Sequence, residues 1–87
     1  MWKLSFTATA IKELKKIGQP TKDRIIAFLE EKIQTDNPLY YARALKGGFE
    51  GFYSFRIGKW RAIAEVIASE LIIIVISVDK REDVYRK

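Results

Sequence analysis

The sequence feature that most constrains the fold is the stretch Leu71–Val78, which reads Leu-Ile-Ile-Ile-Val-Ile-Ser-Val. Side chains of a β-strand alternate between the two faces of its sheet, so a strand with this sequence is apolar on both faces. Such a strand belongs in the centre of a sheet, with cover on both sides. The stretch is too short to cross a bilayer, which takes about 20 apolar residues in a helix. We therefore expect a sheet built around this strand.

A β-hairpin is expected directly before the central strand. Its two strands are Phe52–Ile57 and Trp60–Ile67. The Gly58-Lys59 pair between them suits a primed two-residue turn, because glycine accepts the positive φ of its first position. This turn sets Arg56 directly opposite Arg61. The short connection through residues 68–70 then makes the three strands an antiparallel meander.

The N-terminal half is expected to form a strand followed by two helices. The elements are a strand at Trp2–Phe6, a helix capped by Thr7 or Thr9 and ended by Gly18, and a helix from about Pro20 to Asp36-Asn37-Pro38. We expect the helical hairpin on one face of the sheet. The first strand takes the open side of Leu71–Val78. With the four strands numbered along the chain, their expected order across the sheet is second, third, fourth, first. The prediction is one α+β domain over residues 1–87, with residues 36–51 as the longest irregular stretch.

Charge and composition limit the function. Sixteen Lys and Arg against eleven Asp and Glu give a net charge of +5, which favours an acidic partner: nucleic acid, an acidic protein or an anionic membrane. The chain has no Cys and no His, so it lacks thiolate and imidazole ligands. We expect no metal and no cofactor, and any catalysis must use Lys, Arg, Tyr or carboxylates. The N-terminus does not resemble a signal peptide, so we expect a cytoplasmic protein without a membrane partner.

Basic side chains are expected to gather at one end of the sheet. Ser54, Arg56 and Arg61 share a face in the hairpin register. A two-residue turn before the last strand would set Val78 beside Arg61, and the chain would leave the sheet at that end through Lys80, Arg81 and Tyr85. Arginines bind phosphate through two parallel contacts and a tyrosine can stack on a base, so the group suits a phosphodiester or RNA. The alternative is a solvated hairpin face next to a surface turn whose charges pair with one another.

Three stretches resemble the RelE/ParE superfamily of toxin–antitoxin toxins. They are Ala44-Leu45-Lys46-Gly47 with Gly51, the hairpin Tyr53–Arg61, and Val78–Tyr85. The first is similar to the family's leucine-lysine-glycine approach to the hairpin. The second is similar to its alternation of aromatic, basic and apolar residues around a glycine turn. The third is similar to its C-terminal motif, often His-Arg followed by a short link to Tyr. The resemblance covers nearly the whole chain.

The resemblance implies an mRNA interferase, an endoribonuclease that usually cuts mRNA in the ribosomal A site through attack of the RNA 2′-hydroxyl on the adjacent phosphate. By motif, Arg61 would stabilise the phosphate and Arg81 would bind or protonate near the leaving group. Tyr85 would orient or deprotonate the 2′-hydroxyl. Lys80, where many relatives have His, is the titratable candidate. The expected substrate-binding residues are Arg56, Ser54 and Lys46.

The resemblance also implies a cognate antitoxin, a small, acidic, partly disordered protein that folds on binding. The sequence departs from the family at Ser54, which is basic in ribosome-dependent members, and at Lys80. Two alternatives therefore stay open: a ParE-like toxin that binds DNA gyrase without nuclease chemistry, and an inactive member that acts only as a binding module. Arg81 and Tyr85, present at the family spacing, favour the RNA interpretation.

Overall fold

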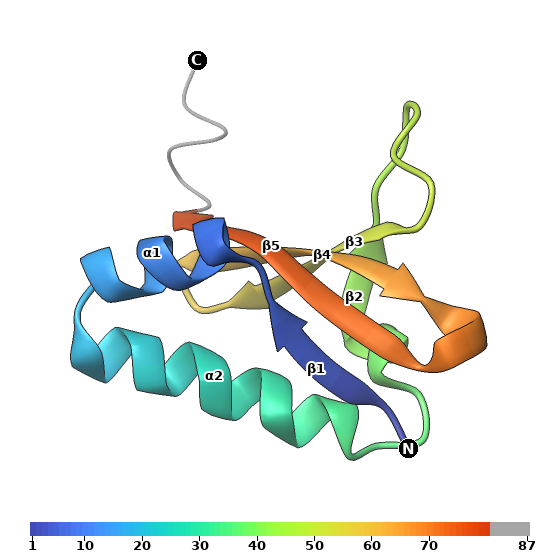
Figure 1. Ribbon diagram of the computed structural model, residues 1–87, viewed down its shortest axis with the longest axis horizontal. Coiled ribbons are helices and arrows are strands. Elements are labelled where there is room, and N and C mark those ends of the chain that lie inside the picture. The colour runs from blue at the N-terminus through green and yellow to red at the C-terminus, as the bar shows by residue number, and fades with distance from the viewer. Residues whose placement is uncertain (81–87) are drawn as a thin grey trace.

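The computed structural model describes residues 1–80, which form a five-stranded sheet with two helices on one face (Figure 1). The elements are β1 (Lys3–Phe6), α1 (Ala8–Lys16), α2 (Gln19–Ile33), the 3-10 helix η1 (Pro38–Tyr41), β2 (Ala42–Ala44), β3 (Phe52–Ile57), β4 (Trp60–Ile67), the 3-10 helix η2 (Ala68–Glu70) and β5 (Ile72–Lys80). The strand order is β1-β5-β4-β3-β2, with β1 parallel to β5 and the other neighbours antiparallel. The α+β class, the helical hairpin and the order of the four predicted strands are confirmed.

β5 lies inside the sheet, between β1 and β4, as its apolar sequence requires. The face of the sheet that meets the helices forms one core, whose members are at most 4% exposed: Ala10, Leu14, Ile25, Leu29, Phe55, Ile57, Ala62, Ala64, Ile73, Val75 and Val78. The expected cover on both faces is not found within residues 1–80, because both helices lie on this one face. On the other face Ile72 and Ile74 are half-buried. Ile67 of β4 lies directly opposite Ile72, so neighbouring isoleucines shield one another there.

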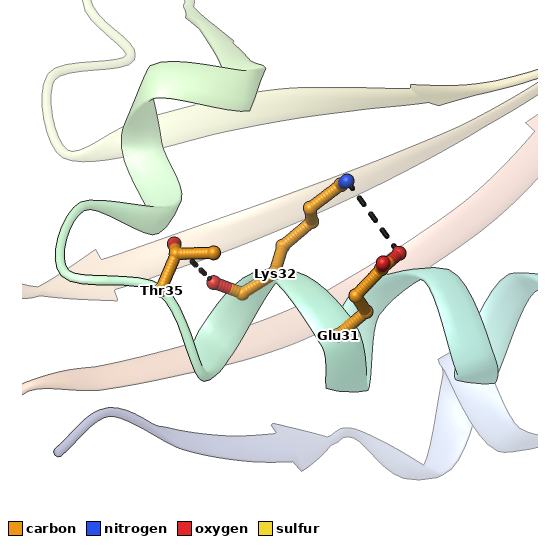
Figure 2. Close-up of polar contacts among 3 residues, drawn as sticks. All are labelled: Glu31, Lys32 and Thr35. Atoms are coloured by element: carbon orange, nitrogen blue, oxygen red, sulfur yellow. Dashed lines mark hydrogen bonds and ion pairs between the residues drawn. The ribbon is translucent and has the colours of Figure 1, made fainter.

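The strand β2 was not predicted and forms an edge of the sheet beside β3. Three residues are too few to show an alternating pattern, so the pairing with β3 alone defines this strand. The preceding η1 is held to α2 by Lys32, whose Nζ lies 4.4 Å from the ring centroid of Tyr41 and 5.0 Å from that of Phe28. The same ammonium lies 3.5 Å from the Glu31 carboxylate, and the Thr35 hydroxyl donates to the Lys32 carbonyl at 2.7 Å; both contacts are drawn in Figure 2. These contacts fix the approach to β2.

A β-bulge at Ile76 changes the register of β5 against β4. Ala64 lies opposite Val75, but the next pair is Ile63 with Ser77, which leaves Ile76 without a cross-strand partner on β4. Thr7 supports the bulge from the start of α1, because its hydroxyl donates to the Ile76 carbonyl at 3.2 Å. The same hydroxyl accepts from the Ala10 N–H at 3.2 Å and so caps the helix, which selects Thr7 over the alternative cap Thr9.

Glu13 of α1 makes a second contact just beyond the bulge. Its Oε1 accepts a hydrogen bond from the Val78 N–H at 2.7 Å. The predicted pairing of Val78 with Arg61 is wrong, because Val78 lies opposite Ala62 and Arg61 lies opposite Asp79. The extra residue in the bulge moves every later side chain of β5 to the other face.

We expect Thr7→Val to lower the free energy of unfolding by about 1–2 kcal/mol, because it removes both the helix cap and the hydrogen bond to the bulge. Urea unfolding measures this loss. Thr9→Val is the matched control at an exposed position of the same helical turn, and it should change stability by less than about 0.5 kcal/mol. Equal losses in the two variants would contradict the role given to Thr7.

Candidate functional site: an arginine pair on the sheet

The β3–β4 hairpin places two arginines side by side. As predicted, Arg56 lies directly opposite Arg61, and Gly58 has the positive φ, 61°, that the turn requires. Phe55 and Ala62 are at most 1% exposed in the core, so their sequence neighbours Arg56 and Arg61 face the side of the sheet away from the helices. Opposed like charges repel one another, which makes this pair a place where a bound anion is stabilising.

Arg61 has a carboxylate partner that the sequence interpretation missed. Its Nε lies 3.5 Å from Asp79 Oδ1 across the β4–β5 pair. Both atoms are buried, and neither has a hydrogen-bond partner among residues 1–80, so the contact is an ion pair without hydrogen-bond alignment. The Arg61 side chain is 18% exposed and that of Asp79 is 47% exposed. Asp79 therefore offsets the charge of Arg61, while Arg56 keeps an exposed charge.

Lys80 lies at the same end of the sheet as the arginine pair but on the opposite face. It pairs with Trp60, and its Nζ lies 5.9 Å from the centroid of the Trp60 ring. Lys80 thus lies at the predicted end of the sheet, but the expected grouping with the arginine pair is wrong, because the bulge at Ile76 turns Asp79 toward Arg61 and Lys80 to the other face. The predicted part of Lys80 in proton transfer stays a prediction.

The other predicted residues fall in three places. Ser54 is half-buried on β3 and shares the face of Arg56, as expected. Lys46 is exposed in the connection between β2 and β3, just before Gly47. Arg81 and Tyr85 lie outside the described residues. Within residues 1–80, Ser54 thus lies on the same face of the sheet as the arginine pair, whereas Lys80 lies on the opposite face.

Arg43 is a second residue that the sequence interpretation missed. It lies on β2 directly opposite Ser54, so it faces the same side of the sheet as the arginine pair. The available signal was weak: a glycine-rich turn at residues 47–51 separates Ala42–Ala44 from Phe52–Ile57, as in a hairpin with a long loop. No local sequence signal marked Asp79, because its position depends on the bulge.

The rest of the described chain bears on two other kinds of site, a metal centre and a membrane span. No group of three or more metal-ligating side chains occurs in residues 1–80, and neither helix there has the length and apolar content to span a membrane. A hollow of about 350 Å³ lies between the N-terminus, the end of α2 and Leu71. Its lining contains one acidic side chain, Asp36, and no arginine.

The sequence matches the family model of the ParE toxin of type II toxin–antitoxin systems over residues 4–85. The chain belongs to this RelE/ParE family of toxins. The family assignment agrees with the resemblance drawn from the hairpin and its flanking motifs. Comparison with curated protein sequences gives no match.

Solved RelE structures share the fold of this family member. The isolated Escherichia coli RelE toxin is 26% identical with a TM-score of 0.73, covering 98% of this chain and 92% of that one. The RelBE2 toxin–antitoxin complex of Mycobacterium tuberculosis matches at 22% identity and a TM-score of 0.82, covering 92% and 98%. The RelB–RelE complex of Methanococcus jannaschii matches at 26% identity and 0.68, covering 93% and 94%.

We expect Asp79→Asn to strengthen phosphate binding by roughly two- to fivefold, because the variant removes the carboxylate that offsets Arg61. Titration calorimetry with inorganic phosphate measures the change. Glu65→Gln is the control, since it removes one negative charge from the same face at a position opposite Phe52 and Ile74, whereas Asp79 lies opposite Arg61. If the two variants bind phosphate equally well, Asp79 does not compete for the arginine pair.

Proposed function

We propose that the protein is a RelE-like toxin that cleaves mRNA in the ribosomal A site and is neutralised by a cognate antitoxin. The observation that carries the proposal is the direct opposition of Arg56 and Arg61 on the helix-free face of the sheet in residues 1–80. Guanidinium groups on two directly opposed residues suit a dianionic phosphorane better than they suit a neutral or cationic ligand.

The reaction is an internal transfer at the phosphate. The RNA 2′-oxygen attacks phosphorus and loses its proton, the bond from phosphorus to the 5′-oxygen breaks, and that oxygen gains a proton. The products are a 2′,3′-cyclic phosphate and a 5′-hydroxyl. Arg61 would offset the charge that builds on the phosphate, with Arg56 binding beside it. The proton steps fall to Arg81 and Tyr85, as the family resemblance implies, and to Lys80 only after a movement that brings it to the arginine face.

The antitoxin part of the proposal is supported by the relatives and by charge. The Mycobacterium tuberculosis and Methanococcus jannaschii relatives are toxins in complex with antitoxins. A net charge of +5 suits an acidic antitoxin as well as RNA. Charge alone does not choose between these partners, so the two interactions need separate tests.

We expect the purified protein to create new mRNA ends at codons occupied by the A site during in vitro translation. Primer extension maps these ends. Arg61→Ala should abolish cleavage, because removing a group that stabilises the phosphorane slows such reactions on the order of 10²–10³-fold. Lys12→Ala is the control: one positive charge is removed from an exposed position on α1, on the helical side of the sheet. Arg81→Ala should also abolish cleavage and Tyr85→Phe should weaken it.

A ParE-like action on DNA gyrase is the second candidate, and the description of the matching family model favours it. The ion pair between Arg61 and Asp79 favours it as well, because Asp79 already offsets part of the charge that Arg61 would offer to a phosphate. Intact mRNA together with inhibited gyrase supercoiling would replace the nuclease proposal with this one. Intact mRNA and unaffected gyrase would leave a binding module that acts through its antitoxin.

A further inference from the structure

The edge strand β2 adds a third guanidinium to the arginine face. In the β2–β3 register Ala42 lies opposite Phe55, and Arg43 lies opposite Ser54. Phe55 is 1% exposed among the helices, so Ala42 points toward the helical layer and the next residue, Arg43, points away from it. Arg43 is exposed. It therefore shares both face and solvent access with Arg56.

The surroundings of Arg43 leave room for an anion. Its direct neighbour Ser54 is short and uncharged, and its diagonal neighbour is Arg56, two residues farther along β3. Diagonal neighbours of an antiparallel pair are about 7–8 Å apart, within reach of long side chains. The guanidinium groups of Arg43 and Arg56 can thus approach a common ligand.

The carboxylates of this face do not balance the charge of Arg43. The ion pairs within residues 1–80 are Lys32 with Glu31 and Arg61 with Asp79, and neither includes Arg43. Glu65 lies on the same face but opposite Phe52, two strands away from β2. The described part of the face therefore carries Arg61, Arg56 and Arg43 from β4 to β2, with Asp79 paired at the β5 end and Glu65 farther along β4.

We propose that Arg43 binds a second phosphate of an RNA strand that crosses β4, β3 and β2, next to the phosphate held by Arg56 and Arg61. This inference rests on the proposed function and names the next contact of the same site. Strands are about 4.8 Å apart, so Arg43 and Arg61 are separated by on the order of 10 Å across the sheet. A single-stranded RNA carries one phosphate per nucleotide and so presents a charge to each arginine in turn.

A different reading gives Arg43 only a protective part. Charged residues on an edge strand discourage pairing with the edge of another sheet, and β2 is such an edge strand. This reading predicts more self-association when Arg43 is removed and no change in RNA binding. The two readings therefore differ in what they predict for RNA.

Binding of a short, fluorescein-labelled 2′-O-methyl oligoribonucleotide, measured by fluorescence anisotropy, tests the inference. The 2′-O-methyl group blocks cleavage and leaves the phosphates intact. Arg43→Ala should weaken binding about tenfold, because one charged contact is lost. It should also reduce the slope of log K against log salt by about 0.7, as one fewer phosphate is neutralised on a single strand. Lys12→Ala on α1, which removes one exposed positive charge from the helical side, should change neither quantity.

A relocation variant makes the test specific for the position of the charge. Arg43→Ala combined with Ser54→Arg moves the guanidinium to the residue directly opposite, on the same face, and should restore most of the affinity and the salt slope. Arg43→Gln keeps a long side chain on the edge strand and should bind as weakly as Arg43→Ala. Agreement between these two variants excludes a loss caused by altered folding of β2.

The outcomes separate this inference from the function on which it rests. Wild-type affinity and salt slope in Arg43→Ala, with binding lost in Arg61→Ala, would overturn the part given to Arg43 and leave the nuclease proposal standing. Increased self-association of Arg43→Ala in sedimentation velocity, with RNA binding unchanged, would assign Arg43 to edge protection instead. A wild-type protein that neither binds the oligoribonucleotide nor cleaves mRNA would overturn both proposals.

Discussion

Three hydrogen bonds around the bulge of β5 decide which side chains meet at the arginine pair. The Thr7 N–H donates to the Val75 carbonyl at 2.9 Å, the Thr7 hydroxyl donates to the Ile76 carbonyl, and Glu13 accepts from the Val78 N–H. These bonds give the backbone polar groups of β5 hydrogen-bond partners on the side of α1, beyond the end of β1. In a strand without the bulge, a lysine would share the face of Arg61. Without the bulge, Val78 would lie directly opposite Arg61; with it, the acidic Asp79 takes that position and Lys80 moves to the opposite face.

The parts of the fold that followed from the sequence are those with local causes. The Gly58-Lys59 turn sets the β3–β4 register by itself, so the opposition of Arg56 and Arg61 was predictable. The apolar run of residues 71–78 requires a central strand, which in turn places β1 on its open side. The bulge has no such cause: Thr7 and Ile76 are 69 residues apart, and a run of isoleucines reads the same with or without an extra residue. The strand β2 likewise could not be predicted locally, because only its pairing with β3 defines it.

The arginine face shows why membership of a fold family leaves the chemistry open. Relatives that share 22–26% of their residues keep the sheet and the helical hairpin, because these depend on apolar pattern more than on particular side chains. The charges on the sheet face are under no such constraint. Here the charged group opposite Ser54 comes from a neighbouring strand, and a carboxylate stands against Arg61. Function must be argued from these residues and not from the backbone that carries them.

The ion pair of Arg61 and Asp79 has a consequence for selectivity. Asp79 is attached to the same sheet as the arginine it contacts, so its local concentration does not fall when the protein is diluted. A small monovalent anion that displaces Asp79 gains one contact with Arg61 and breaks one. A chain of linked phosphates meets Arg56 at the same time, and each further contact adds to its advantage over the tethered carboxylate. Asp79 therefore acts as an internal counter-ion of Arg61. The site favours polyanions over the small monovalent anions that surround the protein.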